Sequence, residues 1–314
     1  MKAANSPLYR IAVSLLVFCP MVLSLSVLVQ PVTAGNVIEN FPAGSGPSGL
    51  AFDGANIWVA NGAGTVTKLR ATDGVILDTI PLGVTLHSAT FDGENVWVSY
   101  GSGHEVAKIR ASDDTVLGTF GVGFGPKRLV FDGTNIWVAN YASNTVTKLR
   151  ASDGAHLQDV GVGEGPWGIA FDGRNIWVTN TADNTVTKFR ARDGAPRGTF
   201  NVGRYPVDVI FDGSKMWVAN YNDDSVTILR VGDGSLLTDL ETASTPIAFA
   251  FDGLQMWLAH ATDGSVTIHR DRDGVRLQTL TVQDGPQDVL YDGTSIWVSN
   301  FDSNTVSKIT HTAH

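Results

Sequence analysis

The chain has 314 residues, 31 of them acidic and 22 basic, and its formal net charge is −9. Such a charge argues against nucleic acid as a partner, because phosphate binding depends on Lys and Arg side chains that neutralise it. The 34 glycines and the 17% of charged residues are typical of a folded protein with many tight turns, and not of a disordered chain.

The first 34 residues have the layout of a secretory signal peptide. A positively charged start with Lys2 and Arg10 precedes an apolar stretch over residues 11–29, and small residues lead up to Ala34. We therefore expect cleavage after Ala34 and a mature protein that is secreted, periplasmic or held at the cell surface. We expect no membrane insertion after cleavage, although the apolar stretch is long enough for the alternative of a retained membrane anchor.

The rest of the chain consists of seven copies of one repeat. Each copy contains Phe-Asp-Gly, or Tyr-Asp-Gly in the last copy, with a tryptophan six residues after the first residue of this tripeptide. Successive copies start 39 or 40 residues apart. The tripeptides start at Phe52, Phe91, Phe131, Phe171, Phe211, Phe251 and Tyr291, and the tryptophans are Trp58, Trp97, Trp137, Trp177, Trp217, Trp257 and Trp297.

Each copy predicts four short strands. In the fourth copy we expect strands over residues 168–171, 176–180 and 185–190 and a last strand that ends near Val202, because β-branched and aromatic residues lie between Asp-Gly and Gly-Pro turns. A four-stranded unit of about 40 residues in several copies is typical of a β-propeller. We therefore predict an all-β fold, in which residues 35–314 form a single seven-bladed propeller of four-stranded antiparallel blades.

The two ends of the repeat region predict how the ring closes. The seventh copy stops after its third strand, at residues 306–309, and has no sequence for a fourth. Residues 37–41, at the other end, align with the fourth strands of the other copies. We expect this N-terminal strand to complete the last blade, because closure removes a free sheet edge.

Residues that recur in every copy have a structural explanation. The aspartate and glycine of each tripeptide suit a tight turn, where glycine takes a positive φ and aspartate caps the turn with its side chain. The tryptophans should pack between neighbouring blades. An arginine ends the third strand in six copies and should pair with a turn aspartate; these residues are Arg70, Arg110, Arg150, Arg190, Arg230 and Arg270.

Residues that differ between copies are free to carry function. In an antiparallel blade the connections from the fourth strand to the next blade and from the second strand to the third share one face, and nearly all the chemical variety lies there. A concave mouth with aromatic and a few polar side chains is a common ligand site. We predict a site for a small molecule, a peptide or a protein, formed by His87, Tyr100, Lys127, Arg128, Trp167, Asp208, Tyr221, His260, Gln287 and Asp288.

No familiar catalytic motif is present in the sequence: there is no Gly-x-Ser-x-Gly, His-Glu-x-x-His, phosphate loop or EF-hand calcium loop. We therefore expect no cofactor. His87, His104 and Glu105 are candidate ligands for a divalent ion such as Mg²⁺ or Ca²⁺, because imidazole and carboxylate groups bind divalent metals. His260 is the candidate catalytic residue.

The repeat resembles the YVTN-type propeller repeat, which is related to the NHL repeat. In the fourth copy, residues 161–170 read Gly-Val-Gly-Glu-Gly-Pro-Trp-Gly-Ile-Ala, and residues 176–180 read Ile-Trp-Val-Thr-Asn, with Asn-Thr-Val following over residues 184–186. The resemblance covers residues 36–310. It implies a propeller that is exported and that binds a ligand or partner.

The chain is also similar, more distantly, to the virginiamycin B lyases, seven-bladed propellers that open a cyclic depsipeptide antibiotic by elimination. This resemblance implies a histidine on the loop face, to which His260 would correspond, and a magnesium ion beside a Glu/His group near the last blade. The seventh copy departs from that pattern, since it has no Glu-x-His and offers Gln287, Asp288, Asn300 and Asp302.

Three functions therefore stay open from the sequence. We expect an exported, monomeric binding module with its site on the variable face. The alternatives are a metal-assisted lyase resembling virginiamycin B lyase and a structural protein of a surface layer. The sequence identifies neither the ligand nor the partner.

Overall fold

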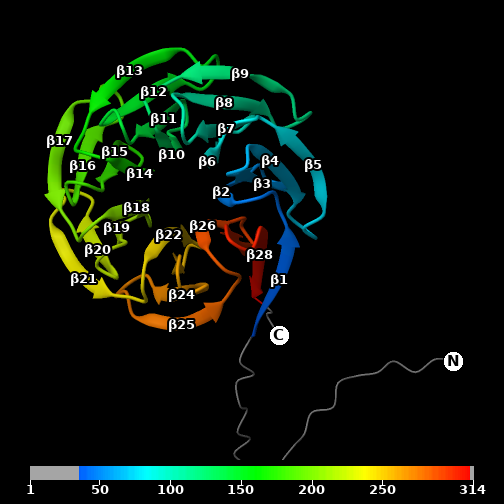
Figure 1. Cartoon of the computed structure of the whole chain (residues 1–314). Coiled ribbons are helices and arrows are strands. Elements are labelled where there is room, and N and C mark those ends of the chain that lie inside the picture. The colour runs from blue at the N-terminus through cyan, green and yellow to red at the C-terminus, as the bar shows by residue number, and fades with distance from the viewer. Residues whose placement is uncertain (1–34, 312–314) are drawn as a thin grey trace, which may run out of the picture. The chain divides into compact units, whose positions relative to one another are not determined.

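The structure, a computed structural model, describes residues 35–311, except for the side chain of His311. The predicted signal peptide over residues 1–34 lies outside the described residues. Residues 35–311 form strands β1 to β28 and no helix, and thus contain no helix that could cross a membrane. The strands make seven four-stranded sheets, arranged as blades around a central axis (Figure 1). The predicted seven-bladed all-β propeller is confirmed.

Each blade runs from an inner strand beside the axis to an outer strand on the rim, and we call its four strands A to D in that order. In this order the blades comprise β2 (Pro47–Phe52), β3 (Asn56–Asn61), β4 (Thr65–Arg70) and β5 (Ile76–Pro81); β6 (Leu86–Phe91), β7 (Asn95–Tyr100), β8 (Glu105–Arg110) and β9 (Val116–Gly121); β10 (Pro126–Phe131), β11 (Asn135–Asn140), β12 (Thr145–Arg150) and β13 (His156–Gly161); β14 (Pro166–Phe171), β15 (Asn175–Asn180), β16 (Thr185–Arg190) and β17 (Pro196–Asn201); β18 (Pro206–Phe211), β19 (Lys215–Asn220), β20 (Ser225–Arg230) and β21 (Leu236–Glu241); β22 (Pro246–Phe251), β23 (Gln255–His260), β24 (Ser265–Arg270) and β25 (Arg276–Thr281); and β26 (Pro286–Tyr291), β27 (Ser295–Asn300), β28 (Thr305–His311) and β1 (Asn36–Pro42).

The repeated tryptophans and aspartates fix the A–B hairpin of every blade. Each tryptophan Nε1 donates a hydrogen bond of 2.6–2.8 Å to Oδ2 of the aspartate in its own Asp-Gly turn. Oδ1 of the same aspartate accepts bonds from turn amides, as Asp132 does from Thr134 and Asn135. The turn glycines have φ between 88° and 99°, where a side chain would be strained. The structural interpretation of these residues is confirmed.

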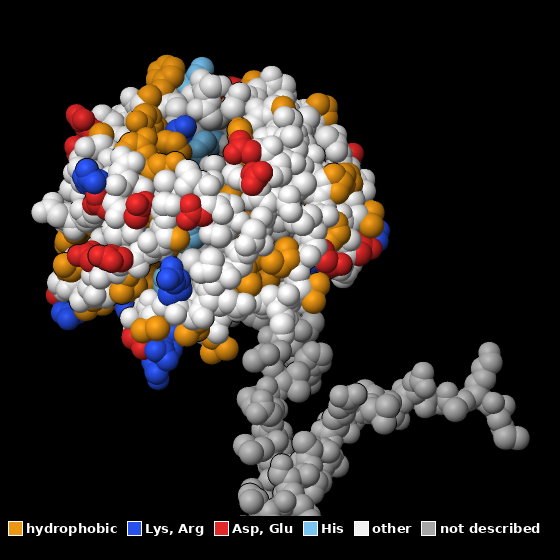
Figure 2. Space-filling model, turned by 60° about the horizontal axis from the view of Figure 1, so that its bottom comes forward, with side chains coloured by type: hydrophobic (Ala, Val, Ile, Leu, Met, Phe, Trp, Pro, Cys, Tyr) orange, Lys and Arg blue, Asp and Glu red, His pale blue; other side chains and the backbone are white. Residues whose placement is uncertain are grey.

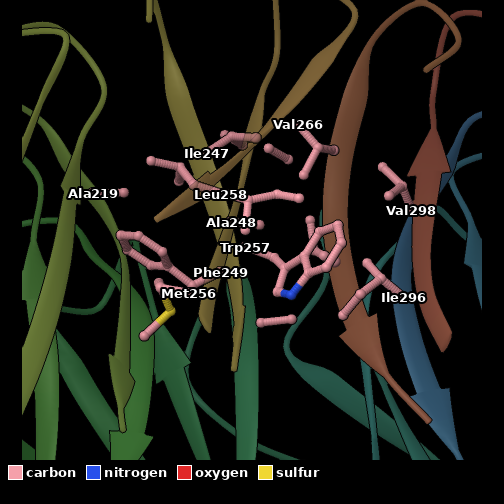
Figure 3. Packing of buried hydrophobic residues seen from close by; sticks show 14 of the residues in the cluster. Ala219, Ile247, Ala248, Phe249, Met256, Trp257, Leu258, Val266, Ile296 and Val298 are labelled. Atoms are coloured by element: carbon pink, nitrogen blue, oxygen red, sulfur yellow. The ribbon is translucent and has the colours of Figure 1, made fainter. Parts of the chain in front are cut away.

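The tryptophans also form the packing between blades. All seven are at most 1% exposed. Figure 3 shows Trp257 of β23 facing Ile296 and Val298, which belong to the next blade, and all three are members of one hydrophobic cluster. Burial of side chains of this size contributes roughly 1.5–3 kcal/mol each, so the core of the ring lies at the interfaces between sheets.

Lysines in the middle of strand C connect neighbouring blades, a role that was not predicted from the sequence. Lys108 Nζ donates to the carbonyl oxygens of Ala151 and Ser152 in the next blade, at 2.7 and 3.0 Å, and lies 5.1 Å from the ring centroid of Trp97. Four further lysines bond the C–D turn of the next blade in this way, and they are Lys68, Lys148, Lys188 and Lys308. The sequence did contain a signal for this role, because the lysine recurs at the same position of the repeat.

The six repeated arginines lie on the surface. Each pairs with the aspartate three residues later in the C–D turn, as Arg150 Nη1 does with Asp153 Oδ2 at 2.8 Å. The predicted pairing is confirmed. Because most of these side chains are well exposed, each pair contributes little to stability.

The ring closes through the N-terminal strand, as predicted. Strand β1 pairs antiparallel with β28, from Asn36 opposite His311 to Pro42 opposite Thr305, and lies beside β28 in Figure 1. Lys308 of β28 then bonds the carbonyl oxygens of Ala71 and Thr72 in the first blade. The last blade is thereby completed by the first strand of the ring.

Candidate functional site

Hydrogen bonds between connections define two faces of the propeller. The B–C connection is hydrogen-bonded to the D–A connection; for example, Thr181 N donates a hydrogen bond to Gly165 O at 3.0 Å. The C–D turn is hydrogen-bonded to the A–B turn; for example, Ala191 N donates a hydrogen bond to Arg174 O at 3.1 Å. We call the first the variable face and the second the turn face. This division agrees with the one expected from the sequence.

Three of the predicted residues form an ion cluster across the central channel. Arg128 Nη1 lies 2.7 Å from Asp288 Oδ1, and Arg128 Nε lies 3.4 Å from Asp208 Oδ1. The second carboxylate oxygen of each aspartate accepts a hydrogen bond of 2.9 Å from a backbone amide of another blade. Asp208 Oδ2 accepts from Phe249 N, and Asp288 Oδ2 accepts from Leu50 N. The cluster therefore links five blades around the axis.

The charges of this cluster are tightly coupled. Burial raises the pKa of Asp208 to about 6, and the Arg128 guanidinium opposes that rise. Burial disfavours the charged form of Arg128, but the carboxylates of Asp208 and Asp288 outweigh this and raise its pKa. Arg128 is thus held as a cation by its two carboxylates, while its buried Nε has no hydrogen-bond partner among the described residues.

The mouth of the channel is too small for a ligand to enter. A cavity of about 20 Å³ lies there, which is room for about one water molecule. Its lining consists of Ser48, His87, Arg128, Trp167, Ile247 and Gln287. A ligand on the variable face would therefore lie over the mouth.

Beside the mouth, His87, Lys127, Tyr141 and Trp167 lie together, and we call them the aromatic–lysine cluster. Lys127 Nζ lies 4.5 Å from the ring centroid of Trp167 and 5.7 Å from that of Tyr141. The Trp167 ring meets Tyr141 edge-on at 5.6 Å and His87 at 5.2 Å between centroids. These contacts join side chains of three blades, because His87, Lys127 and Trp167 start three successive A strands.

The surroundings determine the protonation of this cluster. Burial lowers the pKa of Lys127. Burial also lowers the pKa of His87 well below its ordinary value, and the charges of Lys127 and Arg128 lower it further. His87 is therefore neutral at neutral pH, and Lys127 carries the positive charge of the cluster.

Further aromatic side chains extend the cluster on both sides. Tyr205 and Tyr221 lie 6.2 Å apart between ring centroids. Burial raises the pKa of Tyr205, and the neighbouring Tyr141 side chain raises it further. Phe124, 64% exposed, lies 5.3 Å from His104. Figure 2 shows a hollow in the surface where hydrophobic side chains lie beside Lys or Arg and His side chains.

Two predicted residues are buried away from this surface. His260 is 0% exposed; its Nε2 bonds Thr267 Oγ1 at 2.7 Å and its Nδ1 faces Ser244 O at 3.2 Å. It occupies the place that buried asparagines take in other blades, where Asn220 Nδ2 bonds Thr227 Oγ1. Burial lowers the pKa of His260 to about 4. Tyr100 is also buried, at 8% exposure.

The candidate metal ligands His87, His104 and Glu105 are not brought together. Within residues 35–311, no group of three or more His, Cys, Asp or Glu side chains is placed to hold a metal ion. His87 faces Trp167, His104 faces Phe124, and Glu105 accepts a hydrogen bond from Thr119 at 3.2 Å. The donor set in this part of the chain therefore does not fit a divalent ion.

Tyr205 and Phe124, on the D–A connections, were not predicted as site residues from the sequence. Tyr205 stands where most copies have the glycine before the proline, and it keeps a positive φ of 55°. A residue other than glycine in this region is strained, and strain of this kind gathers at functional positions. The replacement of that glycine was the signal in the sequence.

The fold defines the class of the protein, a closed seven-bladed β-propeller. Among solved structures it is similar to a streptogramin B lyase, with a TM-score of 0.76 and 15% identity over 88% of this chain and 98% of that one. It is also similar to a hydrazine synthase of Kuenenia stuttgartiensis, with a TM-score of 0.74 and 18% identity over 85% of this chain and 96% of that one. No protein-family model and no curated protein matches the sequence. Likeness at this identity establishes the fold alone.

Proposed function

We propose that the protein is an exported binding module that holds its ligand on the aromatic–lysine cluster, over the mouth of the channel. The observation that carries this proposal is the state of Lys127. Its ammonium group is half-buried against two rings, and no side chain in residues 35–311 forms an ion pair or hydrogen bond with it. A cation partly removed from water is costly unless it is paired, and an anionic group of a ligand would supply that pair.

The rings indicate the rest of the ligand. Trp167 and Tyr141 stand edge-on to each other next to Lys127, and such aromatic side chains offer large, rigid surfaces for apolar or sugar rings. The ligand class that fits is a small molecule or a short peptide that combines a ring with a carboxylate. A protein partner would present the same chemistry through an aromatic residue beside an acidic one.

Thermal unfolding against a panel of such compounds tests this proposal. The panel contains aromatic carboxylates, uronic acids, acidic peptides with an aromatic residue, and a streptogramin B antibiotic. Occupancy at a hundred times the dissociation constant stabilises the folded protein by about 2.7 kcal/mol. We expect a compound that raises the melting temperature of the wild type and leaves Lys127→Gln and Trp167→Val unshifted.

Both substitutions use residues that other blades already carry at this position, Gln287 and Val207. The variants alone should therefore fold. Leu254→Thr, on the exposed A–B turn of the opposite face, is the matched control and should shift like the wild type. A compound that stabilises both cluster variants as strongly as the wild type binds elsewhere and contradicts the proposal.

A metal-assisted lyase is the second candidate, and the likeness in fold to streptogramin B lyase is the observation that favours it. On this chain, however, His260 is buried with both ring nitrogens engaged. Conversion of the antibiotic would support the lyase. A surface-layer role predicts self-association instead, which light scattering of a concentrated sample would detect.

A further inference from the structure

A second candidate site lies on the turn face of the fourth blade, opposite the aromatic–lysine cluster. A groove of about 310 Å³ opens there between the A–B turn and the start of the C–D turn. We call it the arginine groove; its lining consists of Phe171, Gly173, Arg174, Arg190, Ala191 and Arg192. This volume lies at the lower end of the range for small-ligand sites, about 300–1,000 Å³.

The repeats show that two of these arginines are peculiar to this blade. At the place of Arg174, the other six copies have Ala55, Glu94, Thr134, Ser214, Leu254 and Thr294. At the place of Arg192, only the sixth copy has an arginine, Arg272. The scaffold therefore folds without either side chain, and a structural role does not explain their presence.

The charges of the groove are not balanced from within. Arg190 and Arg192 share one carboxylate, that of Asp193, at 2.5 and 3.2 Å. The Arg174 side chain has no ion pair among the described residues, and Asp172 at the start of its turn is engaged by Trp177 and turn amides. The groove is thus lined by three guanidinium groups, of which two share the carboxylate of Asp193 and the third has no ion pair among the described residues, on a chain whose net charge is −9.

The sixth blade provides an internal comparison. It has the same arginine pair, Arg270 and Arg272, on Asp273. However, it carries Leu254 in place of Arg174 and Asp271 in place of Ala191. Asp271 pairs with Lys215 of the fifth blade, at 3.2 Å, and not with these arginines. Of these two blades, only the fourth therefore adds a third arginine to the arginine pair.

We propose that the arginine groove binds a compact, doubly charged oxyanion, namely the phosphate or sulfate group of a small molecule. Guanidinium groups match such groups geometrically, because their N–H donors form a planar fork that bonds two oxygens at once. Two arginines without a carboxylate of their own match a dianion in charge. Phe171 supplies an apolar wall for the organic part of an ester.

Isothermal titration of the purified protein at low ionic strength tests this site. The ligands are inorganic phosphate, inorganic sulfate, a sugar phosphate and a sugar sulfate, with acetate as the singly charged control. We expect at least one dianion to bind, with an affinity that falls as sodium chloride is added. Whether the phosphate or the sulfate series binds more tightly identifies the source of the anion.

The decisive variant is Arg174→Thr with Arg192→Ser, which gives the groove the residues of the third blade, Thr134 and Ser152. We expect it to weaken dianion binding at least about tenfold, since hydrogen bonds to charged groups are the strong ones. Arg272→Ser and Trp167→Val should leave binding unchanged, and the second of these keeps this test independent of the variable face. The absence of binding by every dianion, or equal binding by the double variant, overturns the proposal.

Discussion

Arg128 is the single residue on which the centre of the ring depends. At its position the other copies have Gly49, Ser88, Gly168, Asp208, Ala248 and Asp288, so one cation meets two anions among seven strands that all start at the axis. The two carboxylates in turn accept hydrogen bonds from backbone amides of two further blades. Single substitutions here should therefore affect the stability of the whole ring and not of one blade.

Substitution of Arg128 by leucine should destabilise the protein by about 3 kcal/mol or more, because it leaves two buried carboxylates without their cation. Thermal unfolding measures this loss, which we expect as a fall of roughly 6 °C or more in melting temperature. Lys127→Gln, at the adjacent position, is the control and should change the melting temperature little. Equal melting temperatures for Arg128→Leu and wild type would show that the cluster does not hold the blades.

His260 makes stability depend on pH. Its pKa is lowered to about 4 in the folded protein, against about 6.5 in an unfolded chain. The unfolded state therefore binds more protons between pH 6.5 and 4, and stability falls as the pH falls through this window. The contribution of this residue is at most about 3 kcal/mol.

The variant His260→Asn, which restores the asparagine of five other blades, should remove this contribution. We expect equal stability at pH 7.5 and a smaller loss than in the wild type between pH 6.5 and 4, measured by urea unfolding. Carboxylates contribute alike in both proteins, so the difference isolates His260. Parallel pH profiles would mean that the histidine is not held neutral by burial.

At the scale of strands, the contacts that fix a blade join residues close together in the sequence, whereas the contacts between blades join residues far apart. Each A–B hairpin is fixed by a tryptophan and an aspartate five residues apart in the sequence, whereas the strand-C lysines reach carbonyl groups 43 residues away. Strand β1 is the extreme case, since it pairs with β28 at the other end of the chain. The ring therefore depends on β1 more than on any other outer strand.

Deletion of residues 36–42 should leave β28 as an exposed edge and expose part of the hydrophobic packing of the last blade. We expect a lower melting temperature and concentration-dependent association, because unpaired edges recruit other chains. Thermal unfolding and light scattering of the truncated protein measure both effects. A truncated protein that is monomeric and as stable as the full ring would show that the closure contributes nothing.

At the scale of the molecule, the sequence predicts the fold far better than the site. The spacing of Phe-Asp-Gly and tryptophan indicates the number of blades, their strands and the closure, because each follows from short-range pairing that repeats. The contact of Lys127 with Trp167 joins neighbouring blades, and no spacing within one repeat indicates it. The burial of His260 and the separation of His87 from His104 depend on side-chain directions that the repeat pattern does not determine.

We propose that the aromatic–lysine cluster binds a ligand without converting it. The most direct measurement is an equilibrium titration of the strongest compound from the thermal panel, followed by mass spectrometry of the compound recovered from the sample. We predict one binding site, loss of binding in Lys127→Gln, and a recovered compound of unchanged mass. Binding that Lys127→Gln leaves intact, or a recovered compound that has been cleaved or isomerised, would contradict the proposed function.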